Sequence, residues 1–453
     1  MMSCANASTN GATTIMFRAG SPEGHNWLDK MIEKIILFGV VLFPFHNLSL
    51  SLAQSRYDLT AFILLTVSIY FTFKNGSVSK RTILYMQAFV LMQILVFAFI
   101  NIAPYHRFIS GIVWLGGLYL ILLSGKKFNY RQDAVFKMIM YVMLLSAFCI
   151  FSQYLFWGES RPQAWFGEPS YAGLALYSAS AGILCTIIII KMPMQTRFVL
   201  SVAFLVLMSA AFLTLSMHFL TFLLAVILVF FLQSSKNNFL SISPKRALIL
   251  LTIGSILLFI SSYLIGLDHF SSRLNIRNPE TNLSLLSWLR GFDQMTTSIS
   301  NSPILGNGLG STGYFEFRSV YSQSLERLGL DELTLRDSYS LAFRLVIEIG
   351  LPLFIFFMIY FVRRLNIFRS YLVTLMKVPA SQSIPIVFNF VFATSAIIGA
   401  LIKEPLYPNS CLYLGVFLFA SSLPSTSMDH SKRVSSSFKS DSFAQSCVVG
   451  KRN

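Results

Sequence analysis

The sequence predicts an all-α integral membrane protein of about twelve transmembrane helices, with one large extracytoplasmic loop. Of its 453 residues, 55% are hydrophobic and 12% are charged, whereas a soluble globular domain has about 25% charged residues. The apolar residues form runs long enough to cross a bilayer as helices. The 35 lysines and arginines are not gathered on one polar domain but sit in short clusters between these runs. That distribution is typical of a membrane protein and argues against a nucleic-acid-binding one.

The apolar runs are interrupted by short polar segments, and each run is interpreted as one span. We expect spans at residues 32–52, 58–73, 83–102, 108–124, 135–156, 170–190, 197–213, 217–233, 247–266, 340–362, 384–402 and 406–422. The break between 197–213 and 217–233 is short, so a single long bent helix is the alternative there. The sequence therefore leaves the path of this pair open.

The positive charges predict the orientation. If the N-terminus is inside, the inside loops are rich in lysine and arginine, whereas the short outside loops hold only Arg56, Arg107, Arg161 and Lys403. Lys403 is then the single extracytoplasmic lysine. Because inside loops of membrane proteins are enriched in lysine and arginine, both termini are expected in the cytoplasm.

The domain organisation follows from this topology. We expect a cytoplasmic N-terminal segment at 1–30, nine spans within 31–266, an extracytoplasmic loop at 267–339 and three spans within 340–422. The serine-rich segment 423–453 is expected to be a disordered cytoplasmic tail. The N-terminal segment lacks the short apolar core of a signal peptide, so the first span is expected to be retained.

The five cysteines and six histidines show no ligand spacing. A disulfide framework is therefore not predicted, and neither is a metal site. No cofactor is expected.

The loop is the one long polar interruption in the chain. Residues 267–337 carry six arginines, eight carboxylates and no lysine. Apolar residues spaced three apart predict an amphipathic helix at 284–300, which carries Arg290 and is expected on the membrane surface. A second short helix is expected within 314–330.

The first candidate site precedes the span at 170–190. Pro169 suits the first turn of a helix and Glu168 the position before it. Trp165 suits the membrane interface. A capped helix start accounts for these three residues, but not for Arg161 and Glu168 close together at the membrane edge.

The second candidate is the turn-rich segment 301–310, in which glycines permit positive φ angles. By itself a glycine-rich turn is a weak signal.

The third candidate is the start of the span at 340–362. Arg344 and Glu348 are four residues apart and share one helix face, so an internal ion pair is expected. Asp337 lies at the outer mouth, where a helix N-cap is the ordinary role. His218 follows another span end, where a satisfied interfacial histidine and a residue lining a substrate site are the two alternatives.

Together these segments resemble a known superfamily of bacterial surface-polysaccharide enzymes, the O-antigen polymerases (Wzy-type) and O-antigen ligases. The resemblance covers about residues 155–362. It rests on an arginine (Arg161) ahead of Phe166-Gly-Glu-Pro-Ser170, on Leu213-Thr-Leu-Ser216, on Arg290 ahead of Ser302-Pro-Ile-Leu-Gly-Asn-Gly-Leu-Gly310, and on Glu348-Ile-Gly350.

The resemblance favours the polymerases over the ligases. Ligases usually have Gly-Asn-Pro-Asn where this chain has Gly167-Glu-Pro-Ser170, and a His-Asn pair where it has Arg336-Asp337. The missing histidine leaves the identity of a catalytic base open.

What the resemblance implies is a GT-C-like glycosyltransferase of the bacterial cytoplasmic (inner) membrane. It would join undecaprenyl-diphosphate-linked oligosaccharide units at the outer face, with a chain-length co-polymerase as partner. Implied catalytic residues are Arg161, Glu168, Arg290, Asp337 and Glu348. Implied diphosphate- or sugar-binding residues are Arg336, Arg344, His218, Trp165 and Tyr171.

Two other functions remain as alternatives. The first is an O-antigen ligase, which transfers polymer to the lipid A core. The second is a lipid-linked oligosaccharide flippase or other transporter. Transporters often show internal repeats and charges spread through their spans. Here the charges gather on the outer side beside one loop, which favours an enzyme.

Overall fold

The computed structural model describes residues 49–52, 55–58, 80–100, 103–109, 111–112, 132–166, 168–216, 218–234, 282–315, 317, 319–331, 333, 335, 338–376 and 378–403. The expected spans 247–266 and 406–422 lie outside these ranges, as do most of the spans 32–52, 58–73 and 108–124. The candidate residues Arg336 and Asp337 also lie outside the described residues.

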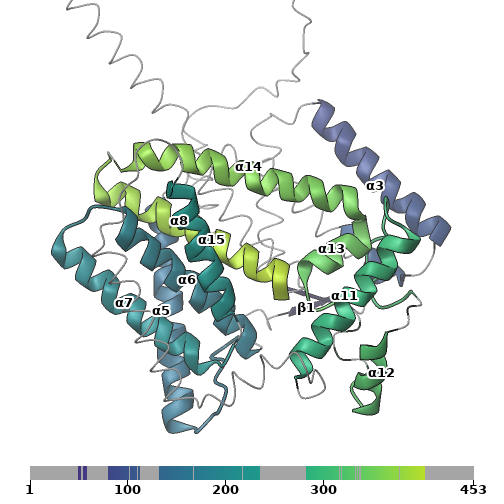
Figure 1. Cartoon of the computed structure of the whole chain (residues 1–453), viewed down its shortest axis with the longest axis horizontal. Helices are drawn as coiled ribbons and strands as arrows, with labels where there is room; N and C mark the ends of the chain where they lie inside the picture. Colours follow the sequence, from purple (N-terminus) through teal and green to yellow (C-terminus); the bar gives the residue numbers. More distant parts are fainter. Residues whose placement is uncertain are drawn as a thin grey trace, which may run out of the picture.

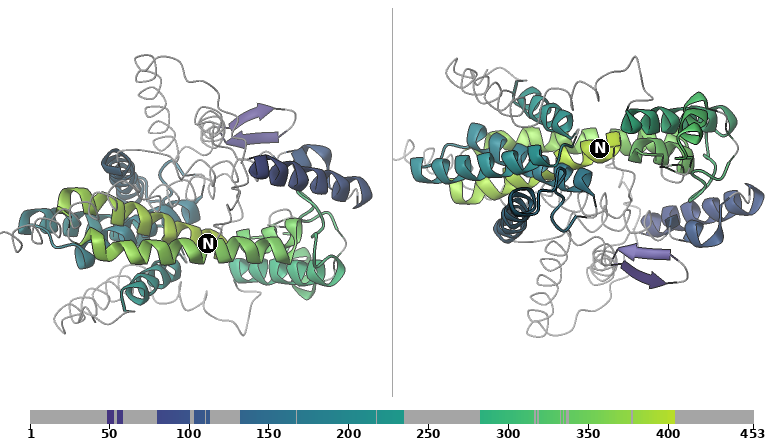
Figure 2. Two further views of the ribbon diagram at one scale, coloured as in Figure 1. Left: turned by 90° about the horizontal axis from the view of Figure 1, so that it is seen from above. Right: turned by 90° about the horizontal axis from the view of Figure 1, so that it is seen from below.

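The described elements are almost all helices. In chain order they are β1 (Ser49–Leu52), β2 (Ser55–Asp58), α3 (Lys80–Ile100), α5 (Gln132–Phe156), α6 (Pro169–Ile189), α7 (Met194–Leu213), α8 (Phe219–Ser234), α11 (Leu283–Asn301), α12 (Val320–Arg327), α13 (Leu341–Ile349), α14 (Leu351–Leu375) and α15 (Ala380–Lys403). Figure 1 shows α5 to α8 and α15 in one group, α11 to α13 in another, and α14 extending along both. Figure 2 shows the same arrangement from above and from below.

One short hairpin departs from the all-α prediction. β1 and β2 pair antiparallel, with Ser49 opposite Asp58. The last four residues of the expected span 32–52 are therefore a strand, Ser-Leu-Ser-Leu. This alternation of polar and apolar residues has the period of a strand rather than of a helix.

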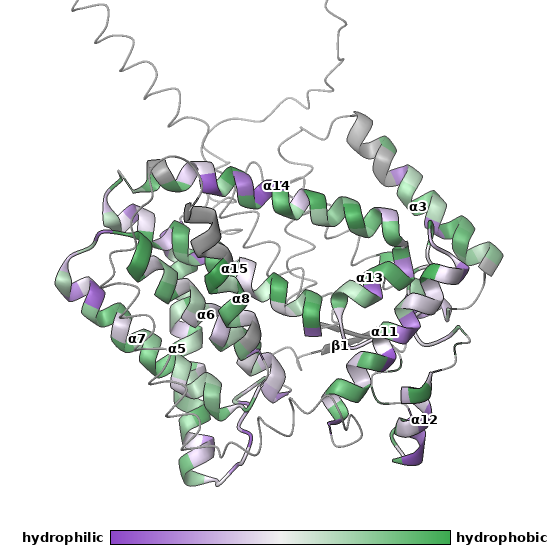
Figure 3. Ribbon diagram, viewed as in Figure 1, coloured by the Kyte–Doolittle hydropathy of each residue, from purple (hydrophilic) through white to green (hydrophobic). Residues whose placement is uncertain are grey.

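Five described helices are long and apolar enough to cross a membrane: α5, α6, α7, residues 351–372 of α14, and α15. The chain is thus a multi-pass helical membrane protein. Figure 3 shows apolar residues along these helices, and more polar residues on α11 and α12. The expected spans at 135–156, 170–190, 197–213 and 384–402 each coincide with one of these helices within a few residues.

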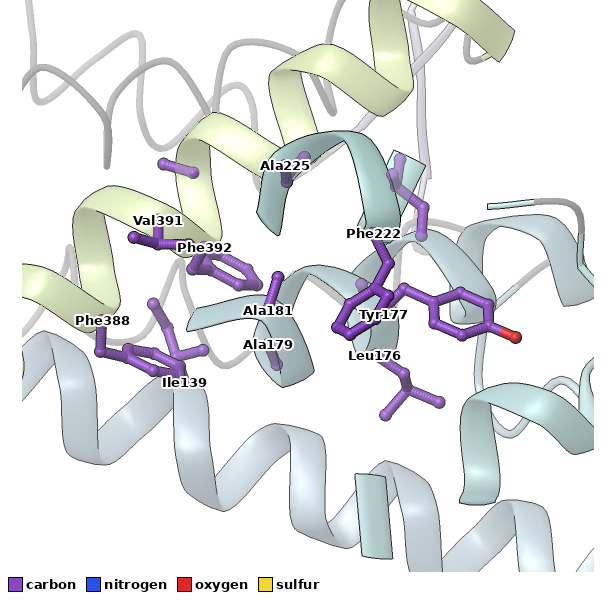
Figure 4. Packing of buried hydrophobic residues seen from close by; sticks show 14 of the residues in the cluster. Ile139, Leu176, Tyr177, Ala179, Ala181, Phe222, Ala225, Phe388, Val391 and Phe392 are labelled. Carbon is purple, nitrogen blue, oxygen red and sulfur yellow. The ribbon is translucent and has the colours of Figure 1, made fainter. Parts of the chain in front are cut away.

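The core lies where α6 packs against α15. Most of α6 is buried, and small residues let the two helices approach closely. A β-carbon on Gly182 would lie 2.9 Å from the ring of Phe388, and one on Gly399 would collide with Leu174. The order of these contacts shows that α6 and α15 pack antiparallel. Side chains of α5 and α8 complete the buried cluster, as Figure 4 shows.

The segment 197–233 forms two helices, which settles the alternative that the sequence left open. Leu215 has a φ of 52°, which ends α7. The turn packs against α6, because a β-carbon on Gly173 would collide with Ser216 and lie 2.9 Å from the hydroxyl of Thr214. A straight continuation of α7 would remove this contact with α6.

The expected span 340–362 is broken at Gly350, whose φ is 82°. Gly350 ends α13, and Pro352 then suits the first turn of α14. The segment 302–307 supplies partners at the break: the Leu351 amide donates to the Pro303 carbonyl at 3.1 Å, and the Asn307 amide donates to the Ile347 carbonyl at 2.7 Å. Non-helical backbone at membrane depth is tolerated where protein groups satisfy it in this way.

Candidate functional site

Helix α11 turns its polar face inward. Ser287, Arg290, Gln294 and Ser298 are buried, at helical spacing, while Leu283 and Phe292 are exposed. The helix expected at 284–300 is confirmed, and so is the short helix expected within 314–330, as α12. The polar face of α11 is therefore buried against the rest of the protein, while Trp288 and Phe292 pack against Phe343 of α13.

Arg290 is the largest side chain among the fully buried residues of the described chain, with 2% of its surface exposed. Its guanidinium donates to the carbonyl of Asp331 at 2.6 Å. One turn further along α11, the Gln294 amide accepts from the Ser338 hydroxyl at 2.6 Å and donates to the Leu335 carbonyl at 3.3 Å. Asp331, Leu335 and Ser338 thus lie along the polar face of α11.

Helix α11 can lie this close to Ser338 only because residue 291 is a glycine. A β-carbon on Gly291 would collide with the carbonyl of Ser338. Ser338 and Tyr339 are both in the left-handed region, with φ of 56° and 63°. Such backbone costs of order 1–3 kcal/mol per residue and persists only where surrounding structure holds it.

A second buried cluster surrounds Glu348 on α13. The Glu348 carboxylate is completely buried and lies 3.0 Å from the Nε of Arg344, which is 16% exposed. It also accepts from the Thr312 hydroxyl at 3.0 Å. The ion pair expected from the i,i+4 spacing is confirmed, and Thr312 is a partner that spacing alone does not reveal.

The two clusters are on neighbouring helices. The Ser298 hydroxyl on α11 donates to the Ile347 carbonyl on α13 at 3.5 Å, and the Asn307 amide donates to Ser298 at 3.0 Å. Arg290 and the pair of Arg344 with Glu348 therefore belong to one structural unit.

The loop 308–314 connects this unit to the first part of the chain. The guanidinium of Arg107 lies 5.4 Å from the centroid of the Tyr314 ring. A β-carbon on Gly310 would lie 2.8 Å from the backbone of Arg107. Arg107 was expected only as one of the few outside cations, and no local pattern in the sequence indicates its contact with Tyr314.

The segment before α6 carries the remaining candidates. Pro169 at the first helical position and Glu168 at the N-cap are confirmed. Glu168 is exposed and accepts from the Ser170 hydroxyl at 3.0 Å. Arg161 is also exposed, and no ion pair within the described chain joins it to Glu168.

Trp165 and Tyr171 are half-buried and pack against the hydrophobic core. The loop that carries Trp165 is held by Gln153, whose side-chain oxygen accepts from the amides of Gln163 at 3.0 Å and Ala164 at 2.6 Å.

His218 lies in the connection between α7 and α8, outside both helices, and is 1% exposed. Its two ring nitrogens have no hydrogen-bond partner among the residues that the structure describes. Burial, and then the positive charge of Lys403, hold the pKa of His218 well below its ordinary value. The described residues thus supply no partner to these nitrogens, and the satisfied interfacial histidine stays a prediction.

The described residues contain no group of three or more His, Cys, Asp or Glu side chains able to hold a metal ion. What the arrangement offers instead is guanidinium groups on two adjacent helices, together with buried hydroxyls and amides. Guanidinium groups suit phosphate and carboxylate oxygens. No protein-family model matches the chain, and a search of the curated proteins finds no similar sequence.

Proposed function

We propose that the chain is a glycosyltransferase that polymerises undecaprenyl-diphosphate-linked oligosaccharide units into a surface polysaccharide, at the outer face of the bacterial inner membrane. The observation that carries this proposal is the buried Arg290 on the polar face of α11, a helix that is bonded to the helix bearing Arg344 and Glu348. The order of motifs that resembles the Wzy-type polymerases gives the proposal its substrate class.

The reaction has a defined electrostatic need. An acceptor hydroxyl oxygen attacks the anomeric carbon of the donor chain, the bond from that carbon to the lipid diphosphate breaks, and its electron pair leaves with the diphosphate. Fixed donors aimed at this developing charge act strongly in a site from which water is excluded. A buried guanidinium such as Arg290 fits that role, because it stays protonated and binds phosphate oxygens with two parallel hydrogen bonds.

The acceptor proton needs a base, and the carboxylates differ in suitability. Glu348 lies against Arg344 and Thr312, and both of these side chains engage its Oε1 at 3.0 Å. We therefore assign Glu348 a positioning role for Arg344. Glu168 is exposed at the start of α6 and is the better-placed base among the described carboxylates, and Asp337 stays a second candidate.

A transporter of lipid-linked oligosaccharides is the second candidate function. The break between α13 and α14 at Gly350 favours it, since discontinuous membrane helices often form the substrate sites of transporters. Against it, the charges of the described site lie beside α11 and the loop, rather than on several spans.

The test replaces Arg161 and Arg290 with alanine, one at a time, and compares the cell's polysaccharide on a gel. Arg290→Lys is a second variant, since lysine keeps the charge but loses the two-pronged geometry. Arg327→Ala is the matched control, because Arg327 is an exposed arginine of the same loop that donates to Ser324.

Each outcome points to one function. Loss of the ladder, with single repeat units still attached to the core, supports the polymerase. Polymer that forms on the lipid carrier but is not attached identifies a ligase. Lipid-linked units that accumulate on the inner face identify a transporter. A ladder unchanged in both alanine variants overturns the assignment of these arginines.

A further inference from the structure

We propose that the exposed side of α14 carries a binding site for the headgroup of an anionic phospholipid, centred on Arg363. The site is distinct from the Arg290 cluster, and the inference holds for a polymerase, a ligase or a transporter alike. Its ligand is a lipid of the surrounding bilayer, whose phosphate contacts the arginine and whose acyl chains lie along α14.

The first observation is that one side of α14 faces lipid. Residues 351–372 form one of the five described segments that are long and apolar enough to span a membrane. Only 22% of the apolar window of this segment is buried, the lowest share of the five. Its exposed side carries Phe356 and Ile359, which are 67% and 60% exposed. Large apolar side chains exposed on a membrane-spanning helix contact the hydrocarbon of the bilayer.

The second observation is a cation on that same side. The expected span ended at residue 362, but α14 continues to Leu375, so Arg363 is held on the helix. Arg363 is exposed, and it follows Ile359 by four residues and Phe356 by seven, which places all three on one face. Figure 3 shows hydrophilic residues within α14 beyond an apolar stretch. The lipid-facing side of α14 therefore changes from apolar to cationic at Arg363.

The third observation is that the protein supplies no partner to this cation. Within the described chain, no hydrogen bond, ion pair or ring contact involves the Arg363 guanidinium. The adjacent Arg364 is 8% exposed, its Nε donates to the Tyr360 hydroxyl at 2.9 Å, and its guanidinium lies 5.3 Å from the centroid of the same ring. Of two neighbouring arginines, one is thus engaged inside the protein and the other is presented to lipid.

A guanidinium on the lipid-facing side of a spanning helix is costly unless a polar group meets it. The bilayer supplies one such group, the phospholipid phosphate, which a guanidinium binds with two parallel hydrogen bonds. An anionic headgroup suits Arg363 better than a zwitterionic one, because a zwitterionic headgroup carries a cation of its own. The pattern of positive charges predicts that this end of α14 is cytoplasmic, where basic residues attract anionic lipids.

Two more polar side chains extend the site. Asn366 and Ser370 are exposed, three and seven residues beyond Arg363, and so lie on the same face of α14. The Asn366 amide group can donate to a second phosphate oxygen, and its oxygen can accept from a headgroup hydroxyl. The Ser370 hydroxyl donates to the Asn366 carbonyl at 3.3 Å, which leaves its oxygen as an acceptor. A headgroup with one phosphate and free hydroxyls, such as phosphatidylglycerol, matches this set.

The experiment uses the full-length protein in nanodiscs of phosphatidylcholine. The probe is a small fraction of phosphatidylglycerol with a photoreactive headgroup, and the readout is the yield of cross-links to residues 363–370, mapped by mass spectrometry of peptides. The variants are Arg363→Ala and Arg363→Lys. Arg364→Ala is the matched control, because it removes the same charge one residue away from the inward side of α14.

We expect Arg363→Ala to lower the cross-link yield about five-fold, the factor that corresponds to one arginine beside an anionic lipid. Arg363→Lys should keep most of the yield, since an ammonium also attracts phosphate. Arg364→Ala should keep the wild-type yield. In detergent, Arg363→Ala should melt with the wild type, because its side chain has no partner in the described chain, whereas Arg364→Ala should melt lower.

Three results would overturn the proposal. The first is an unchanged yield in Arg363→Ala, or an equal loss in Arg364→Ala at an unchanged melting temperature, which would show attraction by surface charge in general. The second is displacement of the probe by inorganic phosphate as readily as by unlabelled phosphatidylglycerol, which would show a site for phosphate rather than for lipid. The third is a change in the oligomeric mass of Arg363→Ala by light scattering, which would show that a second copy of the chain covers this face.

Discussion

Removing Arg344 while keeping Glu348 should destabilise the protein far more than removing both. The Glu348 carboxylate is fully buried, and the Arg344 guanidinium lies 3.0 Å from it. Breaking a buried pair by deleting one partner typically costs about 3–5 kcal/mol, because a charge is left uncompensated. Replacing both partners with apolar residues of similar volume is often neutral or stabilising. Arg344→Ala should therefore lower the melting temperature clearly, and Arg344→Met with Glu348→Met should not.

The assay is thermal unfolding of the purified protein in detergent, followed by tryptophan emission. Thr312→Val provides an intermediate step, since it removes one hydrogen bond to a charged group, worth about 1.5–3 kcal/mol. Lys137→Ala is the matched control, because Lys137 and Asp133 form an i,i+4 pair whose side chains are 58% and 53% exposed. This variant should melt with the wild type. If Arg344→Ala and the double variant melt at the same temperature, the reasoning about the uncompensated carboxylate is refuted.

Three further substitutions test the packing that builds the site, each by melting temperature in detergent. Gly291→Ala should destabilise the protein, because the added carbon collides with the Ser338 carbonyl; a wild-type melting temperature would show that α11 and Ser338 can move apart without cost. Gly350→Ala should destabilise by at least about 1 kcal/mol, since its φ is 82° and L side chains resist that region; an unchanged melting temperature would contradict the rigid break. Asn389→Ala should cost about 1 kcal/mol, because its amide donates to the Gln132 side chain at 2.9 Å and joins α15 to α5; no loss would mean that this bond adds nothing.

Hydropathy located four of the described membrane-length helices, α5, α6, α7 and α15, within a few residues, because length and apolar content are properties of a single segment. The expected span 170–190 coincides with α6, whose Pro169 begins the helix as its fixed φ suggests. The pairing of Arg344 with Glu348 could equally be predicted from the sequence, because side chains four residues apart on a helix are neighbours whatever surrounds them.

The break in the expected span 340–362 could not be predicted from the sequence in the same way. Gly350 and Pro352 are visible in the sequence, but a glycine and a proline within an apolar run do not by themselves end a membrane helix. The break is stable because segment 302–307, more than 40 residues earlier in the chain, donates and accepts the missing hydrogen bonds.

The inward face of α11 was predicted only in part. The spacing of its apolar residues indicated an amphipathic helix. Periodicity alone does not tell whether the polar or the apolar face packs against the protein, because the apolar face can contact a membrane instead. The polar face is buried with Arg290 bonded to the Asp331 carbonyl and Gln294 bonded to Ser338. These partners lie more than 40 residues further along the chain, so the sequence of the helix does not reveal them.

The sequence alone determined that this is a multi-pass helical membrane protein, where most of its described spans lie, and which polar segments interrupt them. The tertiary structure decided that α7 and α8 are separate, that α13 and α14 are divided at Gly350, and that Lys403 lies beside Tyr339. The physical reason is the range of the interactions. Bilayer crossing and helix pairing act within one segment, whereas glycine contacts, broken-helix hydrogen bonds and buried cations depend on residues brought together from distant parts of the chain.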